Sequence, residues 1–406
     1  MDLSQSPKAQ ALTHEIDGFM REHIEPFEHL WHHAQREAPD PWRVMPDIST
    51  LKERAQREGL WNLFLPDAEL GCGLSNLDYA PMAERMGHSF YAPEIFNCNA
   101  PDTGNMEVLF HYGSEDQKTQ WLMPLLRGEI RSAFCMTEPD VASSDATNME
   151  ATAVIEGESV VLNGRKWWST GVGHPDCRVL IFMGLTDPKA PRHARHSMVL
   201  VPMDTAGVRV ERLLTAMGQH DAPYGHGVVS FDSVRVSAQS IIAGPGRGFE
   251  IAQGRLGPGR IHHCMRLIGL AERALDLACR RAVSRRAFGR SLAELGGNGE
   301  RIAEARIAIE QARLLVLKAA WSLDHKGVRK SMSEISQIKV AVPRMAQTVI
   351  DMAIQIHGGA GMSDEFPLAM AFTSARALRL ADGPDEVHRA LIAKLQLKPY
   401  LTDHDD

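Results

Sequence analysis

Two series of apolar residues in the last third of the chain repeat in alternating steps of three and four positions. The first contains Ile302, Ala305, Ile309, Ala312, Val316 and Ala319, and the second contains Ile335, Ile338, Val342, Met345, Val349, Met352 and Ile356. This period places apolar side chains on one face of a helix. Pro343 interrupts the second series without shifting its phase, which predicts a kink in one helix. We therefore expect residues 246–406 to form a four-helix bundle.

The middle of the chain, residues 132–245, has a different pattern. Its short apolar, β-branched runs are RVLIFMGL from Arg178, SMVLVPM from Ser197, VRVERLL from Val208 and VVSFDSVRV from Val228. Asn163-Gly164 lies between two further runs and predicts a two-residue hairpin turn. Neighbouring side chains of a strand point to opposite faces, so either Trp167 or Trp168 is exposed or is covered from outside the sheet. A flat cofactor and interdomain packing are both possible covers.

Residues 1–131 lack strand alternation and are predicted to be helical. The expected helices cover residues 8–33, 47–58, 76–88 and 115–126, and loops are expected at 66–76 and 92–105, where Gly, Pro and Asn accumulate. A chain of 406 residues is longer than a single domain with one hydrophobic core usually is, so several domains are expected. The predicted fold class is therefore mainly α with a central β domain: a helical domain (1–131), a β-barrel or sandwich (132–245) and the helical bundle (246–406).

Composition excludes several classes of function. With 44% hydrophobic and 23% charged residues and a net charge of −7, the chain is predicted to be globular and not to bind nucleic acid. The six cysteines include no C-x-x-C pair, so we expect no zinc site, no disulfide framework and a cytoplasmic location. The histidines at positions 23, 29, 32 and 33 lack a ligand pattern, so no metal is predicted. We also expect no secretory signal and no membrane span.

The stretch RLADGPDEVH, residues 379–388, places Asp382, Asp385 and Glu386 around a Gly-Pro pair. It could be a helix start, with Asp382 as the N-cap and Pro384 in the first turn. It could also be a catalytic site. Taken alone, these residues favour the cap, because acidic helix starts are common.

Other motifs have two interpretations each. The polar loop AFCMTEPDVASSD could hold a phosphate or the edge of a heterocycle. The arginines of RRAFGR could bind a phosphate, or could form an ion pair on the surface. The glycines of QIHGGAG could end a helix or let the backbone approach a ligand. No P-loop, H-E-x-x-H or G-x-S-x-G motif occurs.

Taken in order, FCMTEP, NGRKWWSTG, RRAFGR, QIHGGAGM and LADGPDEVH resemble the acyl-CoA dehydrogenase family, and most of all its subgroup of members ten and eleven. The resemblance extends over essentially the whole chain and implies the fold of that family. It also implies FAD as cofactor and an acyl-CoA as substrate. The implied partners are an electron-transfer flavoprotein and further copies of the chain, as a homodimer or homotetramer. The implied pathway is fatty acid β-oxidation, within lipid metabolism.

The resemblance assigns residues to this FAD site. In the middle domain they are Phe134, Met136, Thr137, Ser143, Ser144, Trp168, Ser169 and Thr170. Trp168 would pack on the isoalloxazine, and the hydroxyls of Ser169 and Thr170 would bond its reactive edge. From a neighbouring subunit would come Arg285, Phe288, Gln355, Gly358 and Gly359. Pro384 and Glu386 would also lie near FAD, while Ser144 and Gly383 would contact the substrate.

Most of the family uses a glutamate that precedes a glycine as catalytic base, and Asp382 occupies that place here. The resemblance implies that Asp382 removes the α-proton of the acyl-CoA while flavin N5 takes the β-hydride, giving a trans-2-enoyl-CoA. Arg260 would support the base electrostatically, although a structural ion pair is an equal alternative. Three departures are the shorter base, Pro384 in place of a threonine, and Gly296 in place of a glutamine. Two alternatives stay open: a flavin oxidase acting on a nitroalkane, and a non-catalytic helical scaffold.

Overall fold

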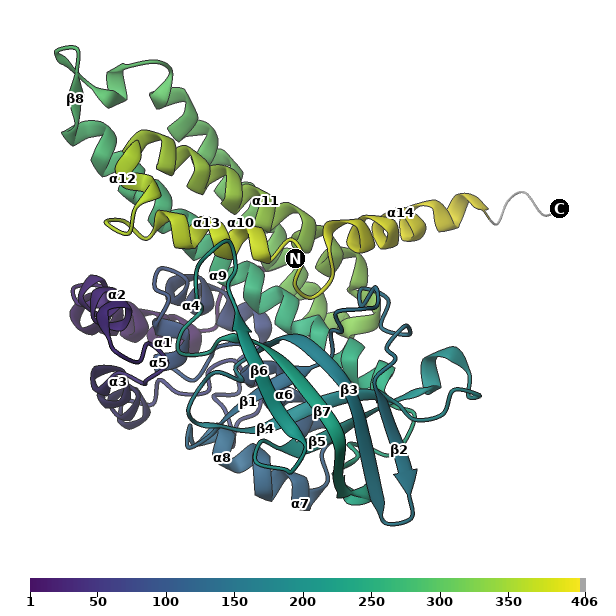
Figure 1. Ribbon diagram of the computed structural model, residues 1–406. Helices are drawn as coiled ribbons and strands as arrows, with labels where there is room; N and C mark the ends of the chain where they lie inside the picture. The colour runs from purple at the N-terminus through teal and green to yellow at the C-terminus, as the bar shows by residue number, and fades with distance from the viewer. Residues whose placement is uncertain (402–406) are drawn as a thin grey trace. The chain divides into compact units, whose positions relative to one another are not determined.

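The computed structural model describes residues 1–401, and these residues form two compact units (Figure 1). The first unit contains residues 1–25, 74–93 and 260 onward, and the second contains residues 26–73 and 94–259. The predicted boundaries between three domains stay a prediction.

The first unit is built from helices. These are α1 (Pro7–Phe19) with a π-helical turn (Met20–Ile24), α4 (Asn76–Met86), the second part of α9 (Gly248–Ser284), α10 (Asn298–Lys330), α11 (Met332–His357), α12 (Gly359–Met362), α13 (Leu368–Ala377) and α14 (Asp385–Leu401). A small hairpin, β8 (Arg286–Ala287) and β9 (Arg290–Ser291), and a 3-10 turn (Leu292–Glu294) join α9 to α10. The predicted helical character of this region is confirmed.

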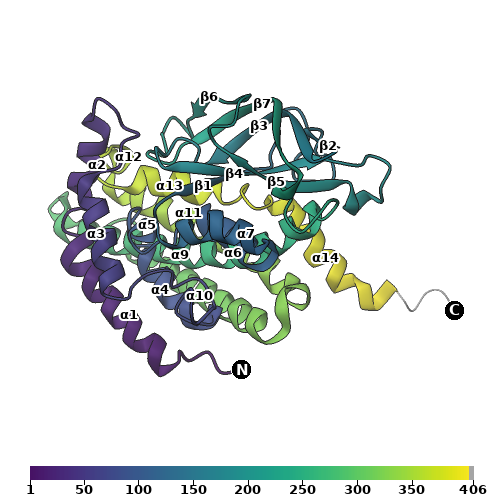
Figure 2. The ribbon, with the colours of Figure 1, turned by 90° about the horizontal axis from the view of Figure 1, so that it is seen from below.

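The apolar series explain how these helices pack. Nearly every residue of the two long series is buried, and α10 packs on α11, which also contacts α13 and α14. α10 lies against α4 as well (Figure 2). α11 runs through Pro343 as one helix, as predicted, whereas the kink itself stays a prediction. α10 contains an interruption that was not predicted, at Gly327, whose φ is 73° and ψ 168°.

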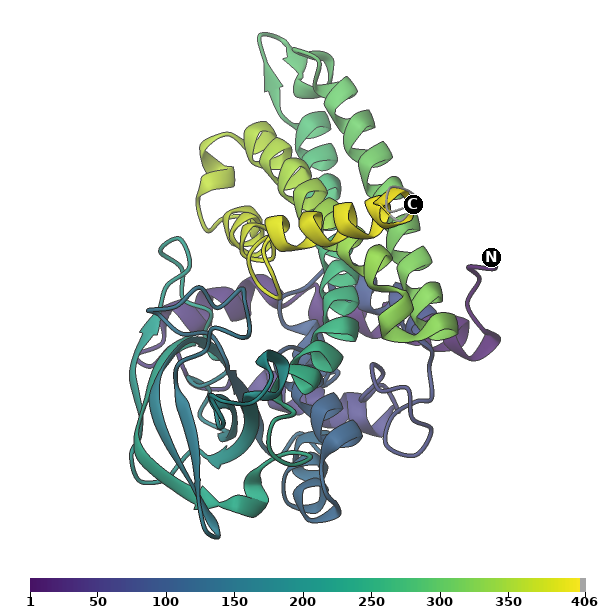
Figure 3. The same ribbon diagram turned by 90° about the vertical axis from the view of Figure 1, so that its right-hand side faces the viewer.

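The second unit is organised around a seven-stranded sheet. Its strands are β1 (Arg131–Cys135), β2 (Thr152–Glu156), β3 (Ser159–Thr170), β4 (Cys177–Leu185), β5 (His196–Pro202), β6 (Val208–Leu214) and β7 (His226–Ser237). Their order is β1-β4-β2-β3-β7-β6, with β5 paired to β4, and the strands curve around one another (Figure 3). All four predicted β runs are strands, and the apolar faces of the sheet form a buried core.

The predicted hairpin turn at Asn163-Gly164 is wrong. β2 and β3 pair with Glu156 opposite Ser159, so the turn is Gly157-Glu158, and β3 continues through Asn163 and Gly164. Gly164 instead sits at an irregularity in the pairing of β3 with β7, with φ of 137°. A Cβ there would lie 2.5 Å from the Ala151 Cβ, so glycine is required by close packing.

Helices also belong to this unit. They are α2 (Glu28–Glu37), α3 (Pro46–Arg57), α5 (Ala92–Ile95), α6 (Asp102–Tyr112), α7 (Glu115–Gln117), a π-helical turn (Lys118–Leu122), α8 (Met123–Leu126), the 3-10 turns Arg192–Ala194 and Ala238–Ser240, and the start of α9. The predicted loop at 92–105 is wrong in part, because α5 and the start of α6 occupy it. The predicted helix at 8–33 is divided among α1, the π turn and α2.

Candidate active site

Asp382 lies in the short connection between α13 and α14 of the first unit. Its φ is 57° and that of Gly383 is 103°, so both residues are in left-handed conformations. α14 begins at Asp385, which means that the predicted N-cap role of Asp382 and first-turn role of Pro384 are wrong. The backbone N–H of Asp382 therefore precedes the helix and is not one of its first-turn amides.

Three side chains hold the backbone of this connection, two from distant segments and one from the helix that follows it. Arg260 Nε donates to the Asp382 carbonyl at 2.9 Å, and His388 Nε2 lies 3.3 Å from the same oxygen. Lys339 Nζ donates to the carbonyls of Leu378 at 2.6 Å and Ala381 at 2.7 Å. Lys339 is buried, and this burial lowers its pKa, although the charge of Asp382 opposes the shift. The backbone of the connection is thus held through its carbonyl groups.

The carboxylate of Asp382 faces a histidine. His263 Nε2 lies 3.6 Å from Asp382 Oδ2, and His263 Nδ1 lies 3.2 Å from Arg266 Nη2. A guanidinium can only donate, so Nδ1 of His263 must accept and its proton must be on Nε2. The N–H of His263 therefore points toward the carboxylate of Asp382.

The start of α14 is anchored by a buried carboxylate. Asp385 accepts from Arg379 Nη2 at 2.8 Å and from Arg344 Nε at 3.2 Å. On the next turn His388 is buried, with Nδ1 3.2 Å from Ser336 Oγ. Burial, assisted by Arg260 and Lys339, lowers the pKa of His388 to about 4, so this imidazole is neutral at pH 7. Glu386 is exposed.

Most of the other predicted cofactor residues lie in the second unit, on β1, the loop after it, and β3. Trp168 is 42% exposed, with φ of 52°, at a second irregularity of β3. Trp167 Nε1 is buried and has no hydrogen-bond partner among residues 1–401. Ser169 is fully buried, whereas Thr170 is half-buried and its Oγ1 lies 2.9 Å from His226 Nδ1. The paired indoles thus differ in exposure, as the strand pattern predicts.

The loop after β1 is tied to β3 by a buried ion pair that sequence reasoning missed. Lys166 Nζ donates to Glu138 Oε1 and to Met183 O, both at 2.7 Å, and to Met136 O at 3.0 Å. Burial lowers the pKa of Lys166, while Glu138 opposes that shift. Thr137 O accepts from Trp167 N at 2.9 Å, so the loop and the exposed Trp168 are held together.

The remaining members of this loop and strand are less enclosed. Phe134 is half-buried, and the Arg255 guanidinium lies 4.1 Å from the centre of its ring. Ser143 Oγ accepts from Glu138 N at 2.9 Å, and Ser144 is exposed. The loop therefore offers Ser144, and not Ser143, as an uncommitted surface hydroxyl.

The residues assigned to a neighbouring subunit lie in the first unit and are exposed. Phe288, at the tip of the β8–β9 hairpin, is 96% exposed with φ of 51°. Arg285 precedes this hairpin and is exposed too. Gln355, Gly358 and Gly359 are exposed at the end of α11. Gly358 has φ of 65° and its N–H donates to Ile354 O at 3.0 Å, which confirms the helix-ending interpretation of this motif.

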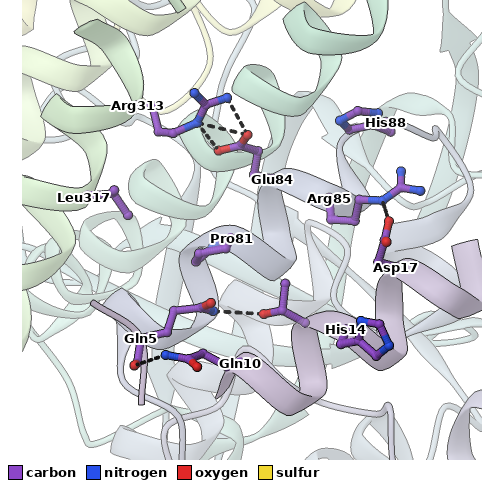
Figure 4. Close-up of a pocket in the computed structure, with 11 residues that line it drawn as sticks. Gln5, Gln10, His14, Asp17, Pro81, Glu84, Arg85, His88, Arg313 and Leu317 are labelled. Carbon is purple, nitrogen blue, oxygen red and sulfur yellow. Dashed lines mark hydrogen bonds and ion pairs between the residues drawn. The ribbon is translucent and has the colours of Figure 1, made fainter. Parts of the chain in front are cut away.

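A cavity of about 480 Å³ also lies in the first unit, lined by residues in or next to α1, α4 and α10 (Figure 4). None of the predicted site residues lines it. Glu84 accepts from Arg313 Nη2 at 2.8 Å, and Asp17 accepts from Arg85 Nε at 2.7 Å. Its charged groups are thus already paired, so the cavity provides no argument for substrate binding.

Family models match the chain in three consecutive parts. The acyl-CoA dehydrogenase N-terminal domain matches residues 6–129, the middle domain 133–234 and the C-terminal domain 246–397. The chain belongs to the acyl-CoA dehydrogenase family. Both the predicted family and the predicted fold class are thereby confirmed.

Curated relatives and a solved structure agree with this family. Acyl-CoA dehydrogenase family member 10 of Mus musculus is 54% identical over 97% of this chain, and the candidate acyl-CoA dehydrogenase FadE2 of Mycobacterium tuberculosis is 50% identical over 98%. A solved structure from Mycobacterium abscessus, described as a candidate acyl-CoA dehydrogenase, is 65% identical with a TM-score of 0.95, covering 98% of this chain and 100% of its own.

The chain spans only part of some curated relatives. It covers 37% of the mouse family member 10 and 51% of family member 11, but 97% of FadE2. Within residues 1–401, this acyl-CoA dehydrogenase family member has no group of three or more His, Cys, Asp or Glu side chains that could hold a metal ion. In the same range, no helix has the length and apolar character needed to cross a membrane.

Proposed function

We propose that this protein is an FAD-dependent acyl-CoA dehydrogenase that forms a trans-2-enoyl-CoA with Asp382 as its base. The observation that carries the proposal is the connection between α13 and α14. Its backbone is pinned through the carbonyls of Asp382, Ala381 and Leu378, while the Asp382 carboxylate stays partly exposed, with 18% of the side chain accessible. A base that is held by its backbone keeps its position while its carboxylate exchanges protons.

The middle-domain residues fit a flavin. A flat aromatic ring needs an apolar face, and Trp168 presents a 42% exposed indole. Such a ring also carries polar edges. The buried Trp167 Nε1 has no hydrogen-bond partner in the part of the chain that the structure describes, and Thr170 provides a half-buried hydroxyl. When bound, FAD would supply the hydride-accepting atom. Phe134, Met136, Thr137, Ser143, Ser144 and Ser169 would complete the lining of this site.

Residues of the chain itself would remove the α-proton of the substrate. Asp382 would take the α-proton of the thioester, while Gly383 and Ser144 would contact the substrate. Arg260 contacts the carbonyl of Asp382 rather than its carboxylate, so its role would be to position the base. A solvated carboxylate is too weak a base for this proton, so the bound state must exclude water and stabilise the developing negative charge.

The test is to mix anaerobic, FAD-loaded protein with a panel of acyl-CoA thioesters and to record flavin absorbance. At least one acyl-CoA is expected to bleach the flavin with formation of the enoyl product. A protein that binds FAD but is bleached by no member of the panel would contradict the acyl-CoA assignment. A protein that neither contains nor binds FAD would support the non-catalytic scaffold.

One observation keeps a second function in view. The base is an aspartate, which flavin oxidases of this fold that act on nitroalkanes also use. Such an oxidase would consume oxygen and release hydrogen peroxide with a nitroalkane substrate. A dehydrogenase would instead reduce an artificial electron acceptor with an acyl-CoA.

We further propose an electron-transfer flavoprotein as the physiological acceptor, a cytoplasmic location and a role in fatty acid β-oxidation.

We also propose that two copies of the chain complete each cofactor site. Phe288 is almost completely exposed on a two-residue turn. Burying a phenylalanine side chain contributes about 1.5–3 kcal/mol of favourable free energy, which this exposed ring does not gain within its own chain. A neighbouring subunit is the expected cover for this ring, and Arg285, Gln355, Gly358 and Gly359 are exposed as well. Pro384 and Glu386 would approach the cofactor from their own chain.

Phe288→Ala is expected to lower FAD retention and to shift the protein toward monomers, because it removes the apolar contact at the hairpin tip. FAD content after gel filtration and sedimentation velocity measure the two effects. Met217→Ala is the matched control, since Met217 is also exposed, at 67%, with φ of 51°, but is not a residue of the predicted site. Full FAD retention in the Phe288 variant would contradict the assignment.

A further inference from the structure

Three polar residues of the second unit, Thr170, His226 and Asp221, lie in a row that is separate from the Asp382 connection. The antiparallel pairing of β3 with β7 places Thr170 directly opposite His226. His226 Nδ1 lies 2.9 Å from Thr170 Oγ1, and His226 Nε2 lies 3.6 Å from Asp221 Oδ2. The Trp168 ring lies 5.4 Å from the imidazole, centre to centre. The row thus begins at the end of β3, next to Trp168, and ends at Asp221, whose side chain is 49% exposed.

The direction of the hydrogen bond between Thr170 and His226 depends on which nitrogen of the imidazole carries the proton. Asp221 Oδ2 lies 3.6 Å from Nε2, and the negative charge of an ionised carboxylate favours the proton on this nearer nitrogen. Nδ1 of a neutral imidazole is then an acceptor, and the Thr170 hydroxyl must donate to it. On the neighbouring strands, Thr170 of β3 and Leu214 of β6 are the residues paired with His226, and the Trp168 ring lies beside the imidazole. Thr170 is left with oxygen lone pairs to offer to a ligand.

We propose that His226 is a positioning residue that makes the Thr170 hydroxyl an acceptor toward the cofactor, and thereby favours reduced FAD over oxidised FAD. This inference rests on the proposed function, in which Thr170 meets the reactive edge of the flavin. The nitrogen at that edge accepts hydrogen bonds in oxidised FAD and donates one in reduced FAD. A hydroxyl that offers lone pairs therefore matches the reduced form and mismatches the oxidised one.

The first test measures the midpoint potential of the FAD-loaded enzyme. His226→Phe keeps a flat ring but removes both nitrogens, so the Thr170 hydroxyl becomes able to donate. One hydrogen bond corresponds to about a tenfold preference, so the variant is expected to have a midpoint potential lower by about 30 mV for a two-electron couple. His220→Phe, six residues earlier and exposed beside Trp42, is expected to leave the potential unchanged. An unchanged or raised potential in the His226 variant would overturn the inference.

The second test needs no cofactor. In protein labelled with ¹⁵N-histidine, the His226 signals are identified by their loss in His226→Phe, and are expected to show a protonated Nε2 and an unprotonated Nδ1. Thr170→Val should shift the Nδ1 signal, and Asp221→Asn the Nε2 signal. A protonated Nδ1 in the neutral ring would refute the inference. If the protein fails to bind FAD, the proposed function fails, while this spectrum still shows which nitrogen of His226 carries the proton. If FAD binds and the midpoint potential of the His226 variant stays unchanged, the inference alone fails.

Discussion

Asp382→Asn is expected to abolish most acyl-CoA-dependent flavin reduction, while the protein still folds and retains FAD. General bases typically contribute about 10²- to 10⁴-fold to a rate, and an amide cannot accept the α-proton. The backbone contacts of this residue use its carbonyl, which the substitution leaves in place. Rapid mixing of the anaerobic enzyme with a substrate acyl-CoA, with flavin absorbance as the signal, measures the loss.

Two further variants make this result specific. Asp351→Asn makes the same chemical change at an exposed position of α11 and should leave the rate unchanged. Asp382→Glu adds the methylene that most of the family has at this place, and it should retain part of the rate. If Asp382→Asn is bleached as fast as the native enzyme, another group is the base.

The sequence-based prediction succeeded where one local period decides the structure. The steps of three and four in α10 and α11 place apolar residues on one face whatever the helix packs against, and nearly all of those residues are buried. Asn163-Gly164 shows where such reasoning stops. A positive φ at glycine suits a turn and also a bulge, and here the choice depends on distant contacts: Ala151 crowds Gly164, and Asn163 Oδ1 accepts from Ser233 N at 2.8 Å.

Long-range partners also explain the helix that was predicted as a loop. Asp102 and Asn105 of α6 suggest a polar loop, yet both are buried and bonded to Ser132 at the start of β1. The site shows the same limit. Motifs led to Asp382, but His263 and Lys339 approach it from α9 and α11, whose positions near Asp382 no local pattern reveals. One signal was present, because Lys339 is a charged residue within the apolar series of α11.

Glu138→Ala is expected to lower the free energy of unfolding by about 3–5 kcal/mol, because it leaves the fully buried ammonium of Lys166 without its counter-charge. Adding Lys166→Met removes that charge, so the double variant should recover most of the loss. About 1–3 kcal/mol should remain, since the amides of Glu150 and Ala151 lose the carboxylate that accepts from them at 2.9 and 3.1 Å. Urea unfolding of the cofactor-free protein measures both values, with the exposed Glu150→Ala as control. A double variant as unstable as Glu138→Ala alone would show that the two amide contacts, and not the ion pair, hold the loop on β3.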